Sequence, residues 1–193
     1  RSTLFPYTTL FRSSYSNEAQ PFKGTFDGCN HTIKGVRVHK EDYDSGLFGN
    51  SHGTIKNVIL DGAIIYGLSN RGGICGANGG TIENCIVSNS SIINDYYWAA
   101  GGLVGTNKGT LSNNLVINTT VGYAYGVGVI IGGKEEGSDL SNNYYYNCTL
   151  NVERSGIGAP SGDLPQNNGA MPAPIIDGDI DDPVSFTVQK DNQ

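Results

Sequence analysis

The sequence predicts an all-β protein, a right-handed parallel β-helix (a solenoid) of about five coils. The main observation is a Gly-apolar-apolar-Gly motif whose closing glycines lie 27, 29 and 27 residues apart. Each of the first three copies is followed by Gly-Thr-apolar-x-Asn. A period of this size is typical of a solenoid, in which each unit buries its apolar face only against its neighbours. The first three copies close at glycines to which we assign a structural role: Gly49, Gly76 and Gly105.

Alternation within the second motif sets the expected register of the strands. After Gly53, Ile55 and Asn57 fall on one face of a strand and Thr54 falls on the other. Stacking the copies about 4.8 Å apart gives an interior column of aliphatic side chains, followed at the turn by a column of amides. We expect these amides to form a buried hydrogen-bonded ladder, and further apolar runs to complete three short strands per coil. The ladder comprises Asn57, Asn84 and Asn113.

The first and last coils are expected to be imperfect copies of the repeat. Gly24–Ile33 forms the first coil, with a tight turn at Asp27-Gly28. The last coil starts near Ser138 and runs into Tyr144–Tyr146. Because the ends of a solenoid expose strand edges, we expect this tyrosine run to cover the last coil.

These motifs resemble the GLUG-motif repeats of bacterial secreted and surface proteins. The resemblance covers roughly residues 21–150 and includes the lead-in Phe22–Gly28. It implies a β-helix of the kind found in adhesins, and in the region that precedes the catalytic part of some immunoglobulin A-cleaving zinc peptidases. It implies no catalytic residue, because the family pattern contains none.

The remaining segments are expected to lie outside the β-helix. Residues 1–13 resemble a translated sequencing adapter, so we interpret them as an artefact joined to a metagenomic fragment whose true start is missing. Residues 14–20 are a lead-in. Residues 151–193 are richer in Pro, Gly and Asp, and we interpret them as a linker, with a further domain starting near Pro183–Val188 as an alternative.

Composition limits the classes of partner. The net charge of −6 comes without a basic stripe, so we expect no nucleic acid partner. No run is long and apolar enough to predict a membrane span, and we expect a monomeric module. The four cysteines lack the spacing of a zinc site, and we expect no metal or cofactor. Free packing thiols are the favoured interpretation of the cysteines, and disulfides remain open.

Catalysis needs carboxylates that converge on one substrate, and the sequence does not place them so. A glycosidase requires two carboxyl groups roughly 5–9.5 Å apart, whereas Asp61, Glu83 and Asp95 fall at different phases of the repeat. Glu83 is expected to stack beside Lys56. The acidic run Asp177–Asp182 lacks the Gly and Glu that an EF-hand loop needs, so we interpret it as a solvated linker.

Aromatic residues supply the candidate ligand site. They precede successive Gly-apolar-apolar-Gly motifs by three to five residues, which predicts a row of rings at one corner of the coils. Such a row beside polar residues suits stacking against sugars. The alternative is that the rings stack on each other and shield a turn. The residues are Tyr43, Tyr97, Trp98 and Tyr125.

The sequence therefore favours a non-catalytic repeat module of a secreted or cell-surface bacterial protein, acting as a scaffold or adhesin. Glycans or proteins of a host or of the environment are the expected partners. Two alternatives stay open. One is a stalk that positions a downstream zinc peptidase, which would carry His-Glu-x-x-His, and the other is a polysaccharide-active β-helix enzyme.

Overall fold

A computed structural model describes residues 20–39, 43–94, 98–122 and 126–151, together with the strand segments 170–172, 175–177 and 187–189. The predicted artefact at 1–13 and nearly all of the lead-in lie outside these residues. The expected linker is described only in its three strand segments and at Asn151.

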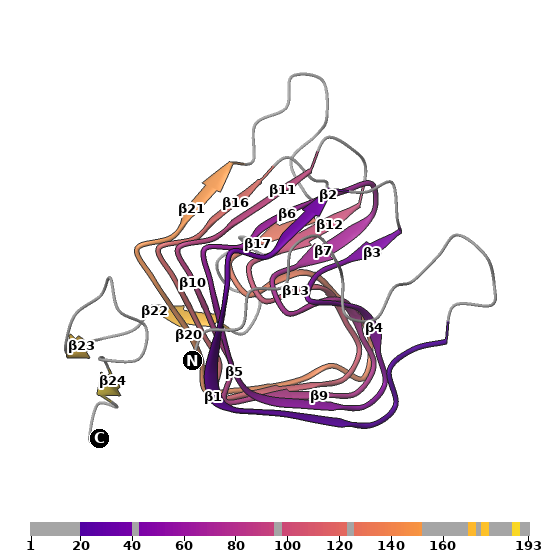
Figure 1. Ribbon diagram of the computed structural model, residues 1–193, viewed down its shortest axis with the longest axis horizontal. Coiled ribbons are helices and arrows are strands. Elements are labelled where there is room, and N and C mark those ends of the chain that lie inside the picture. Colours follow the sequence, from indigo (N-terminus) through magenta and orange to yellow (C-terminus); the bar gives the residue numbers. More distant parts are fainter. Residues whose placement is uncertain are drawn as a thin grey trace.

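The fold is an all-β solenoid of parallel strands, as the repeat predicted, and it makes about four turns rather than five. Figure 1 shows the turns stacked on one another around a common core. A complete turn contains five short strands, so the expectation of three per coil is wrong. The turn in the middle of the stack consists of β9 (Thr81–Glu83), β10 (Ile86–Ser88), β11 (Ser91–Asn94), β12 (Ala99–Gly101) and β13 (Val104–Asn107).

Equivalent strands of successive turns form four sheets. The nine-stranded sheet joins β9 and β10 to β1 (Thr25–Lys34), β5 (Thr54–Asp61), β14 (Thr110–Ser112), β15 (Leu115–Ile117), β19 (Asp139–Ser141), β20 (Asn143–Tyr146) and β22 (Ala170–Pro172). The five-stranded sheet joins β11 to β2 (Arg37–His39), β6 (Ile64–Gly67), β16 (Thr120–Gly122) and β21 (Thr149–Asn151). Apart from these sheets, β23 (Ile175–Asp177) pairs antiparallel with β24 (Thr187–Gln189).

The other two sheets have four strands each. We call one the inner sheet; it joins β12 to β3 (Asp44–Ser45), β7 (Asn70–Gly72) and β17 (Gly126–Gly128). We call the other the flanking sheet; it joins β13 to β4 (Phe48–Ser51), β8 (Cys75–Asn78) and β18 (Ile131–Lys134).

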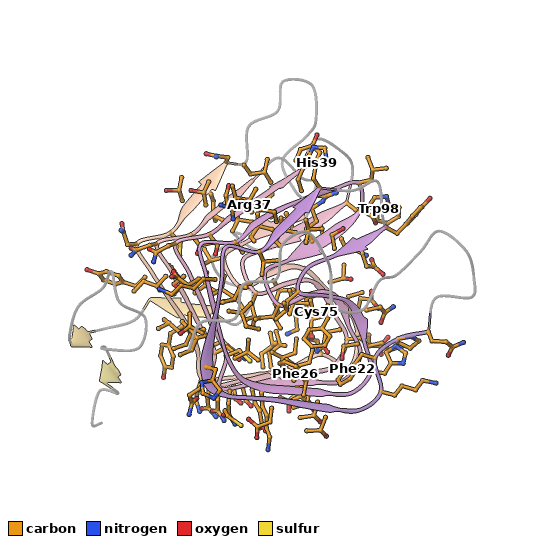
Figure 2. All side chains as sticks on the ribbon, in the orientation of Figure 1. Phe22, Phe26, Arg37, His39, Cys75 and Trp98 are labelled. Carbon is orange, nitrogen blue, oxygen red and sulfur yellow. The ribbon has the colours of Figure 1, made fainter. Side chains whose placement is uncertain are left out.

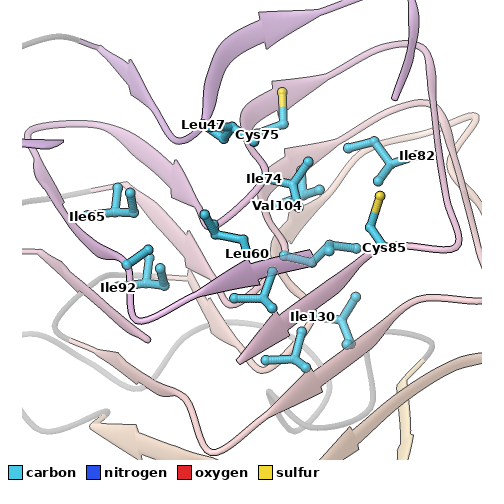
Figure 3. Close-up of a cluster of buried hydrophobic side chains, with 14 of the residues drawn as sticks. Leu47, Leu60, Ile65, Ile74, Cys75, Ile82, Cys85, Ile92, Val104 and Ile130 are labelled. Carbon is cyan, nitrogen blue, oxygen red and sulfur yellow. The ribbon is translucent and has the colours of Figure 1, made fainter. Parts of the chain in front are cut away.

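The predicted register of the Gly-Thr-apolar-x-Asn motif is confirmed. Ile55 pairs with Ile82, which pairs with Leu111, and all three side chains are fully buried. The neighbouring threonines Thr54 and Thr81 pair on the opposite face and are half-exposed. Like residues therefore stack on like, and Figure 3 shows part of the resulting aliphatic core.

The inner sheet explains the Gly-apolar-apolar-Gly motif. Its strands contact both the five-stranded sheet and the flanking sheet, so they form a middle layer of the turn. A Cβ atom at Gly76 would lie 2.5 Å from the backbone nitrogen of Ser45, and one at Gly105 would overlap the backbone nitrogen of Arg71. Only glycine permits this approach, so the motif lets each turn pack against the inner strand of the preceding turn.

The amide columns differ from the prediction in burial. Asn57, Asn84 and Asn113 sit at a corner in the left-handed region, with φ of 53°, 53° and 56°. Asn84 and Asn113 are exposed and Asn57 is half-exposed, so the expected burial of this column is wrong. A turn that needs positive φ selects asparagine, and the amide then points outward.

The buried amides lie one residue later. Asn114 donates from Nδ2 to Oδ1 of Asn143 at 2.9 Å and to the carbonyl of Ile82 at 3.0 Å. A second buried pair joins Nδ2 of Asn78 to Oδ1 of Asn107 at 2.8 Å. Each amide satisfies backbone groups at a corner, where the ladder of strand hydrogen bonds is interrupted.

The two ends of the stack are covered differently. At the first turn, the Phe48 ring packs against Phe22 and Phe26, with centroids 5.2 and 5.3 Å apart. At the last turn, the tyrosine run forms β20, and β22 adds a parallel strand beyond it. The final residue of β22 is Pro172, which has no N–H to offer a further strand.

Candidate binding surface

The structure describes two of the four predicted aromatic residues, and both are exposed. Tyr43 immediately precedes β3 and Trp98 immediately precedes β12, with 41% and 60% of their surface accessible. They therefore lie at the start of inner-sheet strands, at the corner the sequence indicated. Tyr97 and Tyr125 lie outside the described residues.

Tyr43 and Trp98 do not follow each other on successive turns. Asp44 pairs with Asn70, and Arg71 pairs with Ala100. Ser69, which is buried, therefore occupies the equivalent position on the turn between the two aromatic residues. Two strand spacings separate the two aromatic positions by about 9–10 Å, which is too far for direct ring stacking.

A second pair of rings was missed by the sequence reasoning. His39 and Tyr66 pair in register on β2 and β6, and their rings stack with centroids 4.8 Å apart and planes 10° from parallel. The preceding residues, Val38 and Ile65, are buried in the core, so the two rings point outward. Aligning the first coil with the second would have placed His39 over Tyr66 at the step of 27 residues.

The outer face of the five-stranded sheet thus combines a ring platform with apolar and polar neighbours. Ile64 is 42% exposed beside Tyr66. Arg37 stands next to Ile64 in the register and donates from Nη1 to the carbonyl of Gly62 at 2.7 Å. Figure 2 shows Arg37, His39 and Trp98 on the same side of the stack of coils. Such a surface offers aromatic and apolar groups beside a guanidinium group to a ligand.

A shallow polar groove lies on the flanking sheet. The side chain of His52 lies over Gly79, where a Cβ atom would come within 2.9 Å of the imidazole ring. Lys108 and Glu135 line the same groove together with Asn50 and Thr106. Its lining includes one ring, the imidazole of His52, and no Tyr, Trp or Phe, so it offers a sugar less stacking surface than the exposed indole of Trp98 does.

Two of the described carboxylates, Asp61 and Asp27, serve the fold. Asp61 accepts hydrogen bonds from Ser88 and Asn89 and pairs with Lys34 at 3.4 Å. Asp27 accepts from Nδ2 of Asn57, and this bond, with further help from the backbone N–H of Cys29 and from Lys56, lowers the pKa of its carboxyl group. Neither acid faces a second carboxylate as a glycosidase would require.

Lys56 and Glu83 pair in register, as the sequence indicated. The salt bridge recorded for Lys56 nevertheless joins it to Asp27, at 3.6 Å. Asp95 lies outside the described residues. Among the residues that the structure describes, no three His, Cys, Asp or Glu side chains gather closely enough to hold a metal ion.

The cysteines are free thiols in this structure, and two of them are fully buried. Burial raises the pKa of Cys75 well above its ordinary value and raises that of Cys85 to about 12. Their thiol groups contact backbone carbonyls, at 3.0 Å between Cys75 and Ala77. A thiol that stays protonated is a poor nucleophile, so these residues act as packing groups.

A comparison with known protein families finds no match for this chain. Among curated proteins, the chain is 35% identical over 79 residues to halomucin of Haloquadratum walsbyi. That match covers 39% of this chain and 1% of halomucin.

Among solved structures, the fold is similar to that of a Bacteroides ovatus protein provisionally assigned as an immunoglobulin A1 protease, with a TM-score of 0.46 and 21% identity. The similarity covers 67% of this chain and 47% of that one. The chain thus spans a small fraction of halomucin and about half of the Bacteroides protein. In the described ranges of the present chain, no helix long and apolar enough to cross a bilayer occurs.

Proposed function

We propose that this chain is a non-catalytic scaffold and adhesive module of a secreted or cell-surface bacterial protein, and that it binds glycans through exposed aromatic side chains. The observation that carries the proposal is the His39–Tyr66 ring platform on a rigid sheet, on the same side of the coils as the exposed Trp98. In this proposal residues 21–150 form the module, and 151–193 form a linker or the start of another domain, with β22 joining the nine-stranded sheet of the module. The GLUG-like motifs and the short match to halomucin support an extracellular location.

The binding mode follows from the chemistry of the surface. A pyranose presents C–H groups on one face and hydroxyl groups around its edge. The indole of Trp98 and the face of the His39 ring that is turned away from Tyr66 suit the C–H groups, and polar side chains such as Ser91, in register with Ile64, suit the hydroxyl groups. The surface is preorganised by the β-helix, so binding orders few side chains.

Two single substitutions test the proposal. Tyr66→Ala and Trp98→Ala should each weaken binding to a glycan selected on a printed array by at least tenfold. Tyr146→Ala is the matched control, because Tyr146 is 38% exposed on the nine-stranded sheet, away from the platform. Calorimetry gives the affinities, and circular dichroism confirms the β-sheet content of each variant. Unchanged affinity in both Tyr66→Ala and Trp98→Ala would contradict the glycan site.

The function of the whole protein is a separate question from that of this module. Long-read sequencing across the locus distinguishes the alternatives. A downstream His-Glu-x-x-His motif would favour a stalk for a zinc peptidase, whereas further repeats with an anchor would favour an adhesin. A polysaccharide-active enzyme would instead require a pair of carboxylates within one groove, and loss of polymer cleavage when either acid is replaced.

A further inference from the structure

Three asparagines form an exposed ladder at the corner between the nine-stranded and five-stranded sheets. Asn89, Asn118 and Asn147 all have positive φ, at 49°, 48° and 47°. Nδ2 of Asn147 donates to Oδ1 of Asn118 at 2.7 Å, and Nδ2 of Asn118 donates to Oδ1 of Asn89 at 3.2 Å. Asn89 continues the ladder by donating to Oδ1 of Asp61 at 2.8 Å. The column runs along the axis of the solenoid, one amide per turn.

Each member of this ladder begins an Asn-x-Ser/Thr sequence. The hydroxyl residues two positions later stand first in β11, β16 and β21, where they pair with one another in register. Asn-x-Ser/Thr is the acceptor sequence for N-linked glycans. The other corner column, Asn57 to Asn142, has apolar or aromatic residues at the same offset. The hydroxyl residues are Ser91, Thr120 and Thr149.

We propose that this ladder is a site of N-linked glycosylation, and that Asn89 and Asn147 are its acceptors. In the transfer, Nδ2 forms a bond to C1 of a sugar carried on a lipid diphosphate. The bond between C1 and the diphosphate oxygen breaks, the lipid diphosphate leaves, and the amide loses one proton to the base of the transferase. No oxidant or reductant is needed.

The contacts of the ladder are compatible with a glycan at these two residues. Asn89 and Asn147 are exposed. An amide has two N–H groups, and the ladder uses one of those on Asn89 and one of those on Asn147. The linked amide keeps one N–H, so the hydrogen bonds along the column survive. The residue after Asn89 points inward, where Ser90 accepts from the backbone N–H of Ala63 at 3.0 Å.

The spacing of the ladder prevents full occupancy. Adjacent turns are about 4.7–4.9 Å apart, which is less than the width of a pyranose with its hydroxyl groups. Two neighbouring rungs therefore cannot both carry a glycan in the folded protein. Asn118 is the half-buried middle rung and both donates to Asn89 and accepts from Asn147. Modification at the two outer rungs, two turns apart, is the arrangement that fits.

The test is secretion of the full chain from a eukaryotic host, followed by glycopeptide mapping and intact mass measurement of the folded pool. An appended Asn-Gly-Thr tag reports on the host transferase. We expect glycans on Asn89 and Asn147, less than one-tenth occupancy at Asn118, and at most two ladder glycans per molecule. Ser91→Ala and Thr149→Ala should each remove one glycan while leaving the amide ladder in place.

A further variant distinguishes two explanations of low occupancy at Asn118, which are protection by its place in the ladder and a poor acceptor sequence. In the double variant Ser91→Ala/Thr149→Ala, no outer rung carries a glycan, so occupancy at Asn118 should rise at least fivefold. If Asn89 and Asn147 carried no glycan while the Asn-Gly-Thr tag was glycosylated, the proposal would be overturned. Molecules with three ladder glycans would also overturn it. A negative result would not contradict the proposal that the module binds glycans, because the host supplies export in this experiment.

Discussion

Replacing Arg71 with methionine should stabilise the protein. Arg71 is fully buried in the inner sheet, in register with Ser45 and Ala100. Among the described residues, none of its three guanidinium nitrogens has a hydrogen-bond partner, and the hydroxyl of Ser45 has none either. A buried charge without a partner is among the costliest features in a protein interior.

The size of the expected stabilisation follows from the lowered pKa of Arg71. Burial lowers the pKa of Arg71 from 12.5 to about 9. Each pH unit corresponds to about 1.4 kcal/mol, so the fall represents a cost of roughly 5 kcal/mol for holding the charge inside. Methionine keeps most of the apolar stem but leaves part of the guanidinium volume empty. We expect Arg71→Met to raise the free energy of unfolding by about 2–4 kcal/mol.

The pH dependence gives an independent check. Below pH 9 the guanidinium is charged in both states, so the whole cost is present. Between about pH 9 and 12.5 the folded protein releases the proton while the unfolded chain keeps it, so the parent gains stability relative to Arg71→Met. The advantage of the variant should therefore be largest at pH 8 and smaller at pH 10.

Urea unfolding followed by circular dichroism measures the difference. Lys108→Met is the control, because Lys108 is exposed and its replacement removes the same charge; its effect should stay within about 0.5 kcal/mol. If Arg71→Met were less stable than the parent at pH 8, the guanidinium would have a partner, and the reasoning would be refuted.

Three further predictions concern packing. Asn114→Leu should lower the free energy of unfolding by about 3 kcal/mol, because it leaves the carbonyl of Ile82 and other buried groups unpaired. Asn84→Leu should lower it by only about 1–2 kcal/mol, the cost of placing leucine at a positive φ. Equal losses of stability in urea unfolding would contradict this assignment. Gly105→Ala should lower the melting temperature by at least 5 °C on the scale of about 4–8 °C per kcal/mol, and a neutral result would disprove the close approach of the inner sheet. In a thiol-reagent assay at pH 8, the exposed Cys29 should react at once and Cys85 only on unfolding; immediate reaction of both would exclude burial.

Much of the stack could be predicted from the sequence because like residues recur at a fixed step. The column Ile55, Ile82 and Leu111 follows from alternation within the motif. The inner sheet could not be predicted in this way. Strands such as Ala99–Gly101 are three residues long and consist of small side chains, so they carry neither the length nor the alternation of an ordinary strand.

The candidate site was predicted in part for a related reason. The sequence located Tyr43 and Trp98 at one corner, but the motif spacing alone did not reveal that Ser69 separates them. The amide column was placed at the correct turn and given the wrong orientation, because a residue with positive φ changes the direction in which the next side chains point. The buried amide is that of Asn114, one residue after Asn113.

The inner sheet also decides where this chain tolerates changes in length. Two residues connect each inner strand to the following flanking strand in all four turns, and two residues connect β10 to β11, β15 to β16 and β20 to β21. Between the five-stranded sheet and the inner sheet, by contrast, the connections contain four, two, four and three residues. Most of the variation in length lies at this edge, next to Tyr43 and Trp98, and the connection from β18 to β19, with four residues where the equivalent connections have two, is a further longer one. The stack can therefore acquire new surface loops there, one turn at a time, without disturbing the register that holds its core together.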